Sequence, residues 1–142
     1  MKSASARRAP RRVRPAPGSV QSPWLKALAL LLLCAVPGYG AVSVWLHAGR
    51  VVPAALYVAG SVLAFALYRY DKRAAGSGAW RIPEKWLHAA ELAGGWPGAL
   101  LAQQLYRHKT RKLPFQAMFL LIVLIHQAAW ANWLWLGYWP AR

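Results

Sequence analysis

Three long apolar blocks constrain the fold of this chain more than any other feature of its sequence. They cover residues 24–46, 51–70 and 115–138. A helix rises about 1.5 Å per residue, so about 20 residues cross the roughly 30 Å hydrocarbon core of a bilayer. The aromatic residues that close the third block, typical of a membrane–water interface, are Trp130, Trp133, Trp135, Tyr138 and Trp139. The sequence therefore predicts three transmembrane helices.

The composition favours a membrane protein over a soluble domain. Hydrophobic residues make up 58% of the 142 residues, and charged residues make up only 15%. This apolar content excludes intrinsic disorder for most of the chain. The single cysteine, Cys34, excludes an intrachain disulfide framework and a zinc site built on cysteines. The predicted fold class is an all-α integral membrane protein.

A fourth apolar block, residues 86–106, is interrupted in its middle by small and helix-breaking residues, which are Gly94, Gly95, Pro97 and Gly98. Each half has about 8 residues, and about 12 Å of helix covers less than half of the bilayer. Residues 83–106 are therefore predicted to form a broken helical hairpin, re-entrant or interfacial, with these four residues as its hinge. The alternative is a fourth span.

The distribution of Lys and Arg favours the hairpin. If the fourth block turns back, sixteen Lys and Arg residues lie on one side of the membrane and two on the other. If the block spans, the counts become thirteen and five. Cytoplasmic segments collect Lys and Arg, so the first topology fits better. It predicts three spans, a cytoplasmic N-terminus and a C-terminus on the opposite side.

Residues 1–22 are rich in Pro, Ala and Arg and show no apolar periodicity. They are predicted to be a disordered basic arm, and residues 23–142 to be the membrane domain. Such an arm could contact nucleic-acid phosphates only weakly and without sequence choice. A cleaved signal peptide is the alternative for the first apolar block, but its extension to Leu46 favours an uncleaved anchor.

A set of motifs lies between the second and third blocks. They are Tyr70-Asp71-Lys72, Arg81-Ile82-Pro83-Glu84, Gly94-Gly95 and Arg107-His108-Lys109-Thr110. In this order and spacing they resemble DUF1294, a family of small bacterial membrane proteins of unknown function; Glu91 is not part of its pattern. The resemblance implies a multi-pass protein of the bacterial inner membrane without an established activity. Some members carry an N-terminal cold-shock domain, which is absent here, so a nucleic-acid-associated role is an alternative by analogy.

The basic motifs could bind an anion. The candidate residues, which offer cationic and hydroxyl donors, are Lys72, Arg81, Arg107, His108, Lys109 and Thr110. Arg and Lys donors suit a lipid headgroup or an acidic partner, so membrane lipids are the expected partners. Asp71 and Glu84 are predicted to form structural ion pairs, with Pro83 and Glu84 at a helix start, where a carboxylate favours the helix dipole.

The alternative for the polar residues is a membrane-embedded enzyme or metal site. Glu84, His88 and Glu91 recur at positions i, i+4 and i+7, so they share one helix face, and His108 or Asp71 could join them. The spacing matches no recognised metal signature. No phosphate-binding loop, catalytic triad or cysteine nucleophile is evident either, so no cofactor is expected. Transport by three spans would require a homo-oligomer.

Overall fold

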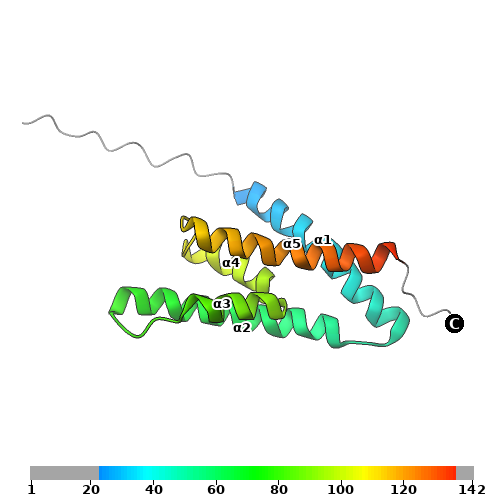
Figure 1. Cartoon of the computed structure of the whole chain (residues 1–142), viewed down its shortest axis with the longest axis horizontal. Coiled ribbons are helices and arrows are strands. Elements are labelled where there is room, and N and C mark those ends of the chain that lie inside the picture. Colours follow the sequence, from blue (N-terminus) through cyan, green and yellow to red (C-terminus); the bar gives the residue numbers. More distant parts are fainter. Residues whose placement is uncertain (1–22, 137–142) are drawn as a thin grey trace, which may run out of the picture.

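The computed structural model describes residues 23–136, with side chains from residue 28 onward. The basic arm predicted at residues 1–22, on which the nucleic-acid hypothesis rests, lies outside the described residues, as do residues 137–142. The described part is all-helical. Its elements are α1 (Pro23–Ala48), α2 (Val52–Ser77), α3 (Glu84–Ala90), a π-helical turn η1 (Glu91–Gly95), α4 (Trp96–Tyr106) and α5 (Leu113–Trp135) (Figure 1).

Three of these helices are long and apolar enough to cross a membrane, which confirms the predicted fold class. The candidate spans are Leu28–Ala48, Val52–Ser77 and Leu113–Trp135. Large apolar side chains such as Leu32, Val62 and Leu120 are exposed along them. Outward-facing apolar side chains on helices whose backbone bonds are satisfied internally are what a lipid environment requires. The protein is therefore a multi-pass membrane protein.

The second helix extends beyond the predicted apolar block, which ended at residue 70. The charged residues that follow lower the hydropathy but do not interrupt the helix, which continues to Ser77. Gly78 then ends it in the left-handed conformation, with φ of 70°, which glycine adopts without a steric penalty. The helical extension carries Asp71 past the apolar part of the span, toward the loop that follows.

The fourth apolar block forms two short helices that run in opposite directions. Figure 1 shows that α3 begins and α4 ends at the same end of the molecule, where the loops of residues 78–83 and 107–112 lie. The connection between α1 and α2 lies at the opposite end (Figure 1). Neither α3, with 7 residues, nor α4, with 11, is long enough to span. The block therefore folds as a hairpin between spans.

The hairpin turns where glycines allow a close approach to α2. Gly94 has φ of 102°, a conformation that L side chains rarely adopt. A Cβ atom on Gly95 would lie 2.4 Å from the carbonyl oxygen of Gly60, and one on Gly98 would lie 2.0 Å from that of Ser61. Gly60 lies about 16 Å from Asp71 along α2, so the turn reaches roughly the middle of a bilayer core. The glycines thus shape the turn and also form its packing surface.

The core joins the hairpin to α2 and α5. It contains Ala64 and Tyr68 from α2, Leu87 and Ala90 from α3, Trp96, Ala99 and Ala102 from α4, and Phe115, Phe119, Ile122 and Val123 from α5. Small residues on α2 and α4 let the two backbones pack closely, as is usual in membrane bundles. This packing fixes the two loops at the hairpin base relative to each other.

Candidate functional site

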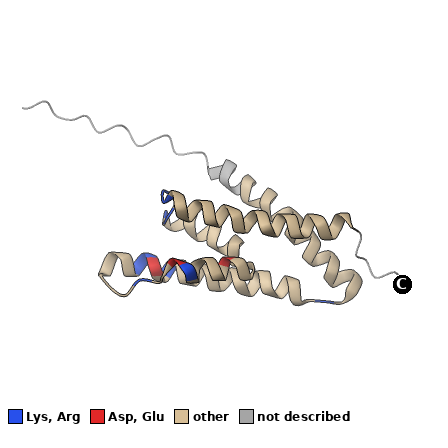
Figure 2. Ribbon diagram, viewed as in Figure 1, with Lys and Arg blue, Asp and Glu red and all other residues tan. Residues whose placement is uncertain are grey.

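The charged residues gather at the end of the molecule where the hairpin begins and ends. Figure 2 shows Lys and Arg residues there. The loop between α1 and α2, at the opposite end, contains Arg50. Residues 69–112 contain nine Lys or Arg residues and all three carboxylates of the chain, an excess of six positive charges. We call this end, comprising residues 69–85 and 107–112, the basic end.

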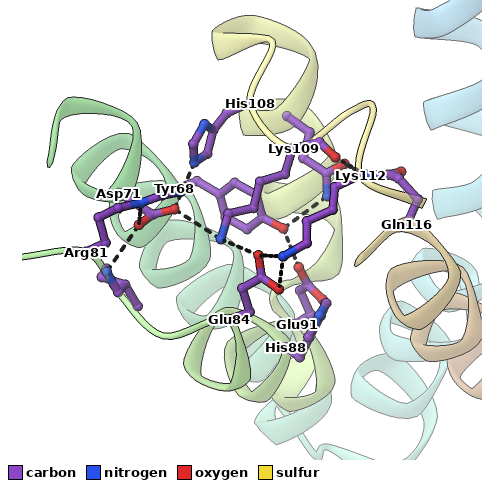
Figure 3. A network of polar contacts seen from close by, with 12 residues as sticks. Tyr68, Asp71, Arg81, Glu84, His88, Glu91, His108, Lys109, Lys112 and Gln116 are labelled. Carbon is purple, nitrogen blue, oxygen red and sulfur yellow. Dashed lines mark hydrogen bonds and ion pairs between the residues drawn. The ribbon is translucent and has the colours of Figure 1, made fainter. Parts of the chain in front are cut away.

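Asp71 is the centre of the polar network at the basic end (Figure 3). Its side chain is fully buried. It accepts hydrogen bonds from the Ile82 backbone N–H at 3.1 Å and from Nε2 of His108 at 2.8 Å. The Lys109 ammonium lies 3.1 Å away, and Nε of Arg81 lies 3.9 Å away. A single carboxylate on α2 therefore holds both basic loops, one through residues 81 and 82 and the other through residues 108 and 109.

The second basic loop adopts an unusual backbone conformation to make these contacts. Arg107 and Lys109 both have positive φ angles, 47° and 61°, which are uncommon for residues with a side chain. The Lys109 side chain is only 5% exposed, its ammonium lies 4.9 Å from the centre of the Phe115 ring, and its carbonyl accepts a hydrogen bond from Gln116. These contacts compensate for the backbone strain and direct Lys109 inward.

Glu84 forms a second ion pair nearer the surface. It is the first residue of α3, and Pro83 occupies the preceding capping position. Its two carboxylate oxygens accept hydrogen bonds from the Lys112 ammonium at 2.7 and 2.8 Å, and Lys109 lies 3.5 Å away. These hydrogen bonds from Lys112 hold the pKa of Glu84 below its ordinary value of 4.5. The pair ties the start of α3 to the residue that precedes α5.

The pH dependence of stability tests this pair. Because the pKa of Glu84 is lowered in the folded protein, the pair stabilises above pH 4.5 and its contribution is lost as the pH falls through the lowered value. The Glu84 side chain is 37% exposed, so solvent screening keeps the effect below about 1 kcal/mol. We expect Lys112→Gln to lower the melting temperature at pH 7, with a smaller difference from the native protein at pH 3. An equal difference at both pH values would contradict this assignment.

Glu91 belongs to a deeper part of the network that sequence reasoning missed. It is fully buried and accepts hydrogen bonds from the Tyr68 hydroxyl and from Nδ1 of His88, at 2.5 and 2.7 Å. Gln103 donates to the Tyr68 hydroxyl and accepts from Gln116. The network therefore connects α2, the hairpin and α5. The signal available in the sequence was the presence of Tyr68, Gln103 and Gln116 inside or beside apolar blocks.

The predicted anion-binding residues divide into two groups. His108 and Lys109 point inward to Asp71 and are largely buried (Figure 3). Lys72, Arg107 and Thr110 are exposed, and the Arg81 side chain remains 58% exposed despite its contact with Asp71. Within the described residues, no carboxylate lies within 4 Å of the charged groups of Lys72, Arg107 or Arg111. The outward-facing cations are thus available to a ligand.

The residues of the metal alternative have separate partners. Glu84 contacts lysines, His88 contacts Glu91, and His108 contacts Asp71. Over the part of the chain that the structure describes, no three His, Cys, Asp or Glu side chains form a group that could hold a metal ion. Residues 84, 88 and 91 therefore share a helix face but do not form a common metal site.

Comparison with known proteins identifies the segment that carries the basic end. Residues 61–115 match the family model described as a protein of unknown function, DUF1294. This segment contains the end of α2, the hairpin and the second basic loop, and it includes Asp71, Glu84 and Glu91. No curated protein and no solved structure matches the chain. Through residues 61–115, the chain is therefore similar to the DUF1294 family.

Proposed function

We propose that the basic end binds the headgroup of an anionic phospholipid. The observation that carries this proposal is that some cations near Asp71 pair with it and others face outward. The carboxylate binds both basic loops through inward-facing groups, and the outer cations Lys72, Arg107 and Arg111 have no carboxylate partner among the described residues. Asp71 thereby holds the two loops against α2, while Lys72, Arg107 and Arg111 face outward.

The physical chemistry of anionic lipids supports this role. Each Lys or Arg close to an anionic membrane surface contributes about 1 kcal/mol to the attraction. Arginine also presents a planar pair of N–H donors that matches a phosphate group. Because the network already fixes the loop backbone, less conformational entropy is lost on binding than for a flexible basic segment. The site is therefore suited to a phosphate-containing headgroup at the membrane surface.

The same charge distribution supports an orientation. Residues 69–112 carry an excess of six positive charges, whereas the loop between α1 and α2 carries only Arg50. Short loops rich in Lys and Arg stay in the cytoplasm, so the proposed arrangement places the basic end and the N-terminus on the cytoplasmic face of a bacterial inner membrane. Phosphatidylglycerol and cardiolipin are anionic lipids that would present such headgroups there.

Removal of the outward-facing charge tests the proposal. We expect the triple variant Lys72→Gln, Arg107→Gln, Arg111→Gln to lose at least about tenfold in affinity for phosphatidylglycerol, since each cation contributes up to about 1 kcal/mol. The measurement is native mass spectrometry of the full chain titrated with phosphatidylglycerol and with phosphatidylcholine. The matched control exchanges the same residues as Lys72→Arg, Arg107→Lys, Arg111→Lys, and Arg50→Gln controls for the opposite end.

Two results would contradict the headgroup proposal. One is an unchanged preference for phosphatidylglycerol over phosphatidylcholine in the triple Gln variant. The other is unchanged lipid affinity together with loss of a co-purifying acidic protein, which would assign the outer cations to a protein partner instead. Retention of the melting temperature in the triple variant shows that any loss of binding is not caused by unfolding.

A further inference from the structure

A groove on the outer side of the hairpin adjoins the basic end. It has a volume of about 490 Å³ and lies between α2 and α3. Leu63 and Leu67 of α2 form one wall, and Ala89 and Ala93 form the other. Trp80 and Trp86 also line it, and these residues are 83% and 59% exposed. The volume falls within the range of ligand sites, about 300–1,000 Å³, and the lining is almost entirely apolar.

The groove is long enough to extend from the membrane surface to about the middle of a bilayer. Its lining runs along the hairpin from Pro83 to Ala93, about 15 Å at about 1.5 Å per residue. The hydrocarbon core is about 30 Å thick, so this length corresponds to one leaflet. Tryptophans at the surface end and alanines at the deep end follow the usual order from interface to hydrocarbon. The shape therefore suits an acyl chain that enters from the surface.

The mouth of the groove carries cations that would pair with a phosphate. Lys85 is adjacent in sequence to Trp86, and its ammonium lies 5.8 Å from the centre of the Trp86 ring. Lys85 is exposed and has no carboxylate within 4 Å among the residues that the structure describes. Arg81, between Trp80 and Ile82 of the lining, keeps more than half of its side chain exposed. An apolar groove with cations at its mouth is complementary to an anionic lipid.

We propose that this groove holds one acyl chain of an anionic phospholipid whose phosphate lies against Lys85 and Arg81. The proposal rests on the proposed headgroup function and assigns the ligand a second point of contact. Inside a bilayer there is no hydrophobic gain on entering a groove, so selectivity comes from van der Waals fit and from the paired phosphate. The small side chains of the alanine wall leave the volume that the acyl chain fills.

Filling the groove tests the proposal in the full chain. Ala93 and Ala89 are exposed, so Ala93→Trp and Ala89→Leu occupy the groove without entering the core. Ala117, an exposed alanine near the start of α5, provides the matched control Ala117→Trp. The probes are dioleoyl phosphatidylglycerol and the short-chain dihexanoyl phosphatidylglycerol, titrated by native mass spectrometry. Melting temperatures verify that each variant is folded.

We expect both groove variants to bind dioleoyl phosphatidylglycerol at least about fivefold more weakly than the native chain, and to bind the short-chain lipid normally, because chain packing is lost and the cations remain. Ala117→Trp is expected to behave as the native chain. Unchanged dioleoyl affinity in both groove variants would overturn the groove proposal and leave the headgroup function standing. Absence of preferential phosphatidylglycerol binding by the native chain would overturn both.

Discussion

Replacing Asp71 with alanine is expected to destabilise the protein by about 3–5 kcal/mol, the cost of leaving buried charges without their partner. Asp71 is fully buried, and the Lys109 side chain that it pairs with is only 5% exposed. His108 and the Ile82 backbone N–H would lose the same acceptor. The measurement is unfolding in a mild detergent by titration with sodium dodecyl sulfate, compared with the native chain.

Two further variants make this prediction specific. Glu84→Gln removes a carboxylate from a partly exposed pair and is expected to cost less than about 1 kcal/mol. Combining Asp71→Asn with Lys109→Met removes both charges of the buried pair, so the double variant is expected to be more stable than the sum of the two single changes predicts. A cost for Asp71→Ala as small as that of Glu84→Gln would contradict the central position of Asp71.

Gly98→Ala is expected to cost about 2–3 kcal/mol or more, although it adds only one methyl group. A Cβ atom at this position would lie 2.0 Å from the Ser61 carbonyl oxygen and 2.6 Å from the Ser61 Cα. Both are backbone atoms of α2, which cannot move aside as a flexible side chain can. The hairpin would have to separate from α2, weakening the contacts that hold the two basic loops together.

Gly38→Ala is the matched control for this glycine. Gly38 also lies within a long helix, α1, but a Cβ atom there would have no neighbour within 4 Å. Alanine is favoured over glycine in a helix, so this change is expected to be neutral or stabilising by about 0.5–1 kcal/mol. Equal effects of the two substitutions in the same unfolding assay would show that the hairpin does not pack on α2 through Gly98.

The sequence was sufficient for the architecture because membrane spans depend on composition averaged over many residues. Three apolar blocks predicted three long helices, and the Gly/Pro interruption at residues 94–98 predicted the broken fourth block. The helix ends were less predictable. Hydropathy ended the second block at residue 70, but a helix ends where its backbone conformation changes, here at Gly78. Hydropathy detects lipid exposure and does not detect helix continuity.

The candidate site was less predictable because its contacts join residues distant in sequence. The loop of residues 107–112 was predicted to contribute Arg107, His108, Lys109 and Thr110 to an anion-binding site. Positive φ angles at Arg107 and Lys109 instead direct His108 and Lys109 toward Asp71 on α2. Glu91 shares a helix face with His88, but its other partner, Tyr68, is 23 residues away. Local spacing indicates which side chains share a face and does not identify what that face packs against.

The most direct test of the account is the side of the membrane on which the two basic loops lie. In a Cys34→Ser background, cysteines are introduced singly as Ser77→Cys, Thr110→Cys and Arg50→Cys, and are labelled with a membrane-impermeant maleimide in intact cells and in inverted vesicles. A returning hairpin predicts that positions 77 and 110 are labelled only in inverted vesicles and position 50 only in intact cells. Labelling of positions 77 and 110 from opposite sides would show that residues 83–106 cross the membrane, and would contradict the assembly of both loops around Asp71.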